Sequence, residues 1–446
     1  MDHAQLQLRE PDAHTATHDG VEQVAASVRA GDPGRARSLT ASVATAARNR
    51  GDTTALARVA LAAAGDGWSS GLDPDSSVLG LLDEALAALA PAPTHLRAEL
   101  LARSAIAGSH SRSSDLVGDQ CEEALAIARM LDDPATTAVA LTARLATDTD
   151  PLHHGETTRT AEGLHRLGVA HDERAWVGWA LVSLARNAAL TGDLDRAAST
   201  FAALEDLGLA GDVVAAHQAA FGAMLRPTLE GDLAEAEAVA ARVRDAGERA
   251  LVDPTAAAAG RWGTVGLLRL LHGRWDDPGD VLVGAFPRRS MAVALVAVIA
   301  AGRAGAGDLA GARQVAESVA PAELAVLERD LYWTTTVAMF AAACALLGDR
   351  DRACALYRAA RPAAGLCAIN PSCVFLGVMD HHLGVLAATA GEPALAAEHL
   401  ERALAAHRRL GSVPWAERSE GELAALRGPA ADGAAVGYQV GSAAPP

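Results

Sequence analysis

Lysine is absent from this 446-residue sequence, so its 38 basic residues are all arginines, and 55 acidic residues outnumber them. The formal net charge is −17 at pH 7. Because proteins that bind the nucleic-acid backbone need a positively charged surface, we expect no direct contact with nucleic acid. A P-loop nucleotide site needs a lysine that reaches the β- and γ-phosphates, so the sequence also excludes a P-loop ATPase.

Cysteines and long apolar runs are scarce as well. Four of the five cysteines lie between Cys344 and Cys373, in a spacing unlike a disulfide framework or a C-x-x-C metal site, and we interpret them as reduced structural thiols. The longest apolar run, residues 291–302, is too short to cross a bilayer, and residues 1–20 lack the basic and apolar regions of a signal peptide. We therefore expect a soluble, cytoplasmic protein with no membrane partner.

Aromatic residues make up only 3% of the chain, whereas half of it is hydrophobic and alanine is abundant. A core built from small side chains requires helices that approach one another closely. Apolar residues recur at helical spacing, for example in residues 81–90, 94–107 and 121–131, and no window alternates over the length of a strand. The predicted fold class is therefore all-α.

One short pattern recurs along the chain: a glycine, usually followed by aspartate, with a small residue five places after the glycine. Glycine can end a helix in the left-handed conformation, and aspartate can accept the free N–H groups of the next helix. Each copy thus predicts a corner between two helices of a hairpin, and copies about 40 residues apart indicate a repeat protein. The corner glycines are Gly192, Gly231, Gly273, Gly307, Gly348 and Gly391, with an earlier copy at Gly31.

The residue five places after each corner glycine is predicted to lie where the two helices cross, with room for little more than a methyl group. It is alanine in every copy except that of Gly273, which has Pro278. The next inward position, one helical turn later, is aromatic in two copies, Phe201 and Tyr357. The crossing alanines are Ala197, Ala236, Ala312, Ala353 and Ala396, with Ala36 in the earlier copy.

This glycine, alanine and aromatic spacing is similar to that of the tetratricopeptide repeat. The resemblance implies a right-handed α-solenoid of tetratricopeptide-like helical hairpins. We expect the solenoid to span residues 21–428, with disorder in residues 1–20 and in the Gly-, Ala- and Pro-rich tail, residues 429–446.

Residues 370–426 carry a more specific set of motifs: a Leu-Gly-x-Leu-Ala-Ala helix, a helix with paired acidic residues, and a Gly-x-x-Pro-Trp-x-x-Arg segment. They resemble the C-terminal helical region of actinobacterial STAND-type signalling ATPases, including LuxR-like regulators. The ATPase engine and the helix-turn-helix of that family have no counterpart here. The matching residues are Leu383, Gly384, Leu386, Ala387, Ala388, Glu398, Gly411, Pro414, Trp415 and Arg418.

The repeats and the resemblance together favour a non-catalytic scaffold that binds a protein or peptide partner in transcriptional or signalling regulation, with no cofactor or metal. The alternative is a small-molecule sensor whose superhelix encloses its ligand. A third possibility, an all-helical enzyme of terpene-cyclase type, depends on a D-D-x-x-D run at Asp276, Asp277 and Asp280. Pro278 interrupts the helix that such a magnesium site needs, so we interpret the run as a degenerate corner.

Histidine pairs give no complete metal site. His14 and His18 have helical spacing but no third ligand nearby, and adjacent residues such as His381 and His382 project about 100° apart on a helix. We interpret these residues, and the pair at 153–154, as solvated or packed side chains.

The candidate partner-binding groove comes from tryptophans early in the first helix of several hairpins. That helix lines the concave surface of tetratricopeptide-like arrays, where aromatic residues and arginines could contact a partner. The alternative is that the indoles fill gaps between repeats. The candidate residues are Trp176, Trp179, Arg186, Trp262, Arg269 and Trp333.

Overall fold

The computed structural model describes residues 13–30, 32–65, 76–109, 112–249, 267–271, 273 and 289–427. The chain divides into two compact units, the N-terminal unit Met1–Thr147 and the C-terminal unit Asp148–Pro446. Apart from one small hairpin of strands, the described chain is helical, which confirms the all-α prediction. None of the described helices is both long and apolar enough to cross a membrane.

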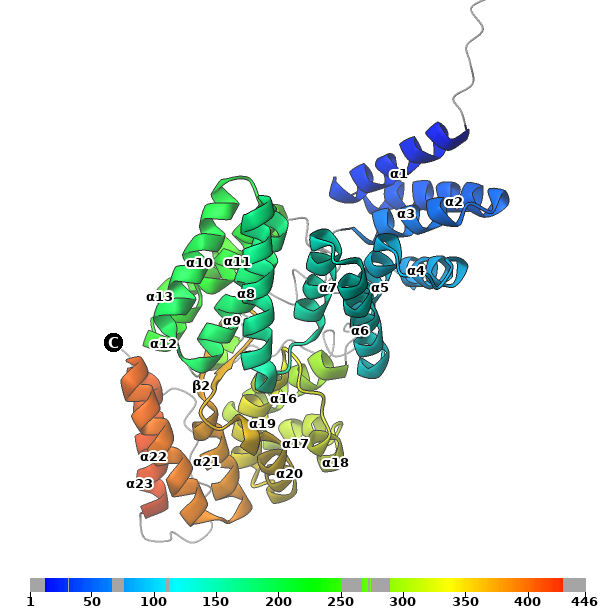
Figure 1. Ribbon diagram of the computed structural model, residues 1–446. Helices are drawn as coiled ribbons and strands as arrows, with labels where there is room; N and C mark the ends of the chain where they lie inside the picture. The colour runs from blue at the N-terminus through cyan, green and yellow to red at the C-terminus, as the bar shows by residue number, and fades with distance from the viewer. Residues whose placement is uncertain are drawn as a thin grey trace, which may run out of the picture. The chain divides into compact units, whose positions relative to one another are not determined.

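The N-terminal unit is a series of helices, most of which contact the next helix along the chain (Figure 1). Its first helix begins at Ala13, inside the segment 1–20 for which disorder was expected. The bounds are α1 (Ala13–Arg29), α2 (Pro33–Arg50), α3 (Thr53–Ala64), α4 (Ser76–Ala88), α5 (His95–Gly108), α6 (Ser114–Leu131) and α7 (Pro134–Thr147).

The C-terminal unit contains the remaining helices and a two-stranded antiparallel sheet. Residues 428–446, which include the tail expected to be disordered, lie outside the described residues. The bounds are η1 (Pro151–His153), α8 (His154–His171), α9 (Arg174–Thr191), α10 (Leu194–Leu209), α11 (Val213–Gly222), α12 (Leu225–Glu230), α13 (Leu233–Arg249), α15 (Leu267–Leu271), α16 (Arg289–Gly305), α17 (Leu309–Ala316), α18 (Pro321–Ala325), α19 (Trp333–Leu347), α20 (Arg350–Ala360), η3 (Arg361–Ala363), β1 (Cys367–Ile369), β2 (Phe375–Val378), α21 (Met379–Ala390), α22 (Pro393–Leu410) and α23 (Val413–Arg427).

The predicted corners are confirmed at Gly192, Gly231, Gly307, Gly348 and Gly391, whereas Gly31 and the residues that follow Gly273 lie outside the described part of the chain. All six corner glycines from Gly192 to Gly391 have positive φ, between 66° and 89°. The following aspartate accepts a backbone N–H of the next helix in four copies, as predicted, so the aspartate starts the helix that the glycine has separated from its predecessor. The capping aspartates are Asp193, Asp232, Asp308 and Asp349.

The crossing alanines are also confirmed, because each of the five from Ala197 to Ala396 is at most 1% exposed. At the crossing near Ala396, the facing residue on the neighbouring helix is Gly384 of α21. A Cβ on Gly384 would lie 2.6 Å from Leu400 Cγ and 3.2 Å from the Ala396 carbonyl oxygen. The two backbones therefore approach too closely for any side chain on α21 at that point.

Two further corners have aspartate where the others have glycine. Asp132 ends α6 with φ 47°, and Asp172 ends α8 with φ 56°. Aspartate tolerates the left-handed conformation better than most residues because its short side chain can bond locally. A repeat pattern based on glycine alone therefore overlooks these two corners.

The β-hairpin differs from the expectation that the chain has no strand. Its residues are buried on both faces, so the sequence of β2, Phe-Leu-Gly-Val, does not alternate. Gly377 in β2 has φ 89°, and a Cβ there would lie 2.7 Å from the Trp415 ring. The glycine thus lets the indole of α23 pack directly on the strand.

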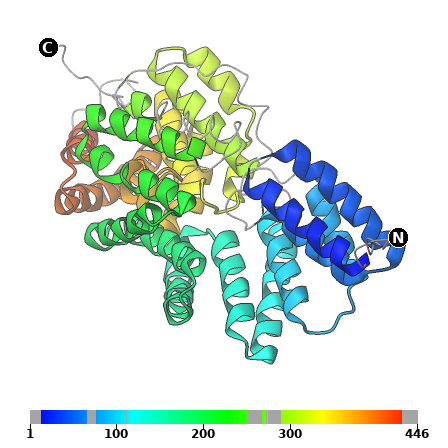
Figure 2. The ribbon, with the colours of Figure 1, turned by 90° about the horizontal axis from the view of Figure 1, so that it is seen from above.

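Segments far apart in the sequence meet around this hairpin within the C-terminal unit. α9, α12, α19, α21 and α22 all contact it, and α12 also contacts α23. In Figure 1 and Figure 2 the C-terminal helices, orange to red, lie beside the green helices that include α12. A large core cluster has members from Ala188 to Trp415, and a smaller one, which includes Leu181, Leu204 and Ala215, lies between α9, α10 and α11.

Candidate functional site

Three of the candidate groove residues lie together on α9. Trp176, Trp179 and Arg186 are all half-buried. Trp179 and Arg186 are seven residues apart, so they project from nearly the same side of the helix. The ring of Trp176 also makes an edge contact with His171, at 6.1 Å between centroids.

Arg186 is the most unusual of the three. Burial lowers the pKa of its guanidinium, and the Asp148 carboxyl and the Cys373 thiol act in the opposite direction. No hydrogen bond or ion pair joins Arg186 to another residue in the described part of the chain. Its charge is therefore less compensated than that of a typical buried arginine.

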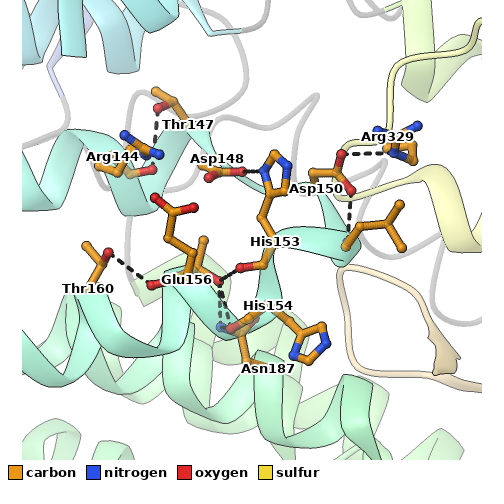
Figure 3. A network of polar contacts seen from close by, with 12 residues as sticks. Arg144, Thr147, Asp148, Asp150, His153, His154, Glu156, Thr160, Asn187 and Arg329 are labelled. Atoms are coloured by element: carbon orange, nitrogen blue, oxygen red, sulfur yellow. Dashed lines mark hydrogen bonds and ion pairs between the residues drawn. The ribbon is translucent and has the colours of Figure 1, made fainter. Parts of the chain in front are cut away.

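The neighbouring residue, Asn187, fixes this part of α9. Its side-chain amide donates to Thr157 Oγ1 at 2.8 Å, to Thr158 Oγ1 at 3.1 Å and to the His154 carbonyl at 3.3 Å. These contacts tie the C-terminal half of α9 to the beginning of α8 (Figure 3). Arg186 is consequently held on a rigid element.

The segment before α8 forms a polar network (Figure 3), and its Asp148 carboxyl acts electrostatically on Arg186. Asp148 Oδ1 lies 2.9 Å from His153 Nδ1, and this hydrogen bond raises the pKa of the imidazole. Asp150 accepts the Leu152 N–H at 2.8 Å and the Arg329 Nε–H at 2.9 Å. Both carboxylates thus have hydrogen-bond partners, whereas no hydrogen bond or ion pair of the Arg186 guanidinium is found among the described residues.

Both edges of the β-hairpin are occupied by side chains from the surrounding helices. Thr228 of α12 accepts the Phe375 N–H at 2.9 Å, and His407 Nε2 of α22 accepts the Val378 N–H at 2.9 Å. His382 Nε2 of α21 donates to the Leu376 carbonyl at 2.7 Å. On the other strand, Thr334 of α19 donates to the Ile369 carbonyl at 2.9 Å.

Trp415 lies at the centre of a buried cluster of aromatic rings and imidazoles. Its ring centroid is 5.3 Å from that of His381, 5.7 Å from His382 and 5.8 Å from His407. The Arg418 guanidinium lies 4.7 Å from the same ring and donates to the Leu271 carbonyl of α15. Trp415 and Arg418 of the Gly-x-x-Pro-Trp-x-x-Arg motif therefore anchor α23 to the interior.

A second polar chain links α20, α21 and α22 in the order of an acid–base triad. Asp380 Oδ1 lies 2.8 Å from His399 Nδ1, and His399 Nε2 lies 3.1 Å from the Tyr357 hydroxyl. Burial raises the pKa of Tyr357, so the phenol is not activated as a nucleophile. Although burial acts to raise the pKa of Asp380, hydrogen bonds from His399, Arg402 and the Gly365 N–H hold it below its ordinary value. We interpret the chain as a structural link between repeats.

The remaining candidate groove residues do not join this site. Trp333 is 1% exposed and packs in the core, as expected of an indole that fills a gap between repeats. Arg269 is half-buried on α15. Trp262 and the acidic run at Asp276, Asp277 and Asp280 lie outside the described residues.

The other residues singled out from the sequence have structural settings. The five cysteines form no disulfide, and burial raises the pKa of Cys367 and of Cys373 to about 12. His381 and His382, expected to include one packed residue, are both 0% exposed. Among the residues that the structure describes, no group of three or more His, Cys, Asp or Glu side chains could hold a metal ion.

Neither a scan against protein-family models nor a search of curated proteins found a match for this chain. The resemblance to STAND-type and LuxR-like proteins therefore stays a prediction.

Proposed function

We propose that this protein is a non-catalytic scaffold that binds a protein or peptide partner. In this proposal the helical hairpins form a right-handed, tetratricopeptide-like α-solenoid that acts in transcriptional or signalling regulation. The confirmed corners and crossing alanines support the repeat architecture. The STAND-type and LuxR-like motif between Leu383 and Arg418 supports the regulatory setting.

The observation that carries the binding proposal is the setting of Arg186. Its half-buried guanidinium has no ion pair among the described residues, which costs free energy in the unbound protein. A carboxylate from a partner would offset this cost through a charge-assisted hydrogen bond. Trp179, on the same side of α9, supplies an adjacent aromatic surface. The partner segment that fits has an acidic group beside an apolar residue.

Capture of partners by the immobilised full chain tests this proposal. Trp179→Ala removes the aromatic surface, and Arg186→Met removes the charge while keeping most of the apolar stem. We expect each to reduce capture by roughly tenfold or more, as expected for truncation of a central contact residue. Arg186→Met should also make capture less sensitive to salt.

Val326→Ala is the matched control, because it removes an apolar side chain that is 82% exposed in the same unit. Unchanged melting curves for all three variants would show that the fold is intact. If neither α9 variant reduces capture, binding does not use this helix and the proposal is wrong.

The alternative, a small-molecule sensor, is supported by the buried β-hairpin, which contacts α9 and has Cys373 within electrostatic reach of Arg186. Such a sensor would bind a small carboxylate at Arg186 without a macromolecular partner. Thermal stabilisation by a panel of small carboxylates, abolished by Arg186→Met but retained by Trp179→Ala, would favour the sensor over the scaffold.

A further inference from the structure

The hydrogen bonds of the hairpin edge determine where the protons lie on two buried histidines. A carbonyl oxygen only accepts, so His382 must carry its proton on Nε2 to bond Leu376. A backbone N–H only donates, so His407 must have a bare Nε2 to bond Val378, and its proton lies on Nδ1.

A serine extends this arrangement to a third histidine. His407 Nδ1–H donates to Ser419 Oγ at 3.1 Å, and the same Oγ lies within hydrogen-bond distance of His381 Nδ1, at 3.0 Å. Neutral rings at His382 and His407 fit these bonds, and all three imidazoles are 0% exposed, where a neutral ring is favoured over a charged one. Burial lowers the pKa of His382 to about 4, that of His407 to about 3 and that of His381 well below its ordinary value.

A proton added to any of the three imidazoles would destabilise the closed structure, in which the imidazoles bond to the β-hairpin and to Ser419. A proton on His407 Nε2 would face the Val378 N–H, with two donors and no acceptor. A proton added to His381 would place a charge, which Arg418 repels, on a fully buried ring. A proton on His382 would sit on Nδ1, which is buried with no hydrogen-bond partner among the described residues.

The charges around the cluster do not compensate for such protons. Arg418 of α23, over the Trp415 ring, acts on all three imidazoles with the same sign as an added proton. Asp380 of α21 is occupied by His399 and Arg402 of α22.

Among the described residues of the other packed elements, Arg186 of α9 acts on the Cys373 thiol and Arg409 of α22 acts on the Cys367 thiol, and both are cations. On α12, Arg226 and Glu230 pair with each other at the surface. The thiols of the hairpin, Cys367 and Cys373, are neutral because burial raises their pKa to about 12. On α23, burial also raises the pKa of the half-buried Glu422 to about 7, so this carboxyl is close to half protonated at neutral pH and more so in acid.

We propose that His381, His382 and His407 form a three-proton latch that holds the β-hairpin against α21, α22 and α23 when neutral and releases it when protonated. Release frees the Val378 N–H and the Leu376 carbonyl, which the imidazoles now occupy. None of the hydrogen bonds that define the latch involves Arg186.

Hydrogen exchange at the Val378 amide, corrected for intrinsic exchange, measures the opening of this latch. Three histidines that regain their ordinary pKa on opening should raise the opening constant about 500-fold between pH 6 and pH 5. His407→Gln keeps an acceptor for Val378, and His382→Gln keeps a donor for Leu376, but neither titrates. Each variant should show a rise of about 60-fold over the same interval, as expected for two remaining protons.

His171→Gln is the control, because it removes an exposed histidine on α8 and should keep the wild-type steepness. Amides of α10 serve as an internal reference for global unfolding. The proposal is overturned if the wild-type rise is below about 60-fold, if both glutamine variants keep the wild-type steepness, or if α10 opens in parallel with Val378. The experiment compares how steeply the opening constant depends on pH, and not how stable each variant is. A variant that is less stable than wild type therefore still tests the proposal.

Discussion

Ser412, at the turn between α22 and α23, donates from its Oγ to the backbone carbonyl of Leu229 in α12 at 2.6 Å, across 183 residues of sequence. Next to this bond, Pro414 lies so close to Gly231 that a Cβ on the glycine would be 2.6 Å from the Pro414 Cγ. An array of hairpins is ordinarily held by contacts between neighbours. The C-terminal unit has these contacts and, in addition, a direct junction between an early helix and its last helix.

Ser412→Ala tests the contribution of this junction. The substitution leaves the carbonyl of Leu229, a residue that is 4% exposed, without its side-chain donor, which should reduce the free energy of unfolding by about 1–2 kcal/mol. Urea unfolding measures the change. Ser199→Ala is the control, since Ser199 is exposed and bonds only within its own helix, and a loss of similar size there would argue against a special role for Ser412.

The crossing position can be tested within one helix. Ala396→Leu should overpack the contact with Gly384 and reduce the free energy of unfolding by about 1–3 kcal/mol. Ala394→Leu adds the same side chain to α22 at an exposed position and should change stability by less than about 0.5 kcal/mol. Equal melting temperatures for the two variants would show that Ala396 is not a crossing residue in solution.

Substitutions of the aspartates at two successive corners should change the free energy of unfolding in opposite directions. Asp172 has φ 56°, so Asp172→Gly should relieve the left-handed conformation and raise the free energy of unfolding by about 0.5 kcal/mol. Asp193 instead caps α10 by accepting the Arg196 N–H, so Asp193→Ala should lower it by about 1 kcal/mol. Denaturant unfolding of both variants gives the sign of each change in the free energy of unfolding. A loss of stability in Asp172→Gly would contradict the proposed cost of the left-handed conformation at Asp172.

The sequence predicted the local geometry of the repeats well, because that geometry depends on single residues. Gly348 must adopt positive φ and Ala353 must fit a narrow crossing, and both requirements are visible in residue type alone. Asp172 fills the same left-handed role without a distinctive side chain, so its corner was missed. The β-hairpin was missed because burial on both faces removes the alternation by which a strand is recognised.

The candidate site was predictable only in part. Trp179 and Arg186 were found because an aromatic residue and a charge at helical spacing are visible in the sequence. The missing ion pair of Arg186 and the bonds of His382 and His407 to the hairpin depend on contacts between residues far apart in the chain. Such contacts have no signature in one sequence, so His381 and His382 were interpreted only as packed or solvated residues.

Glu422 on α23 should make stability depend on pH. Burial raises the pKa of its carboxyl to about 7, above the ordinary value, so the folded state favours the protonated form. The penalty for ionisation is absent below the unfolded pKa, grows as pH rises through the folded pKa, and persists above it. Glu422→Gln should therefore stabilise the protein at pH 8 and have little effect at pH 4.5.

Denaturant midpoints at the two pH values measure this difference. Glu417→Gln, at an exposed position of the same helix, is the control and should shift neither midpoint. An equal gain for Glu422→Gln at both pH values would show that the effect does not come from ionisation.

Removal of α23 distinguishes a linear stack from a unit joined at its ends. In a linear stack, deletion of residues 413–427 should expose only the neighbouring helices and reduce hydrogen-exchange protection in α21 and α22. Because α23 also contacts α12, and Arg418 donates to the Leu271 carbonyl, we expect α12 and α15 to lose protection as well. Amides of α10 should stay protected if the rest of the unit remains folded. Protection retained in α12 and α15 while α21 and α22 lose it would mean that the junction contributes little, and that neighbour contacts alone hold the C-terminal unit together.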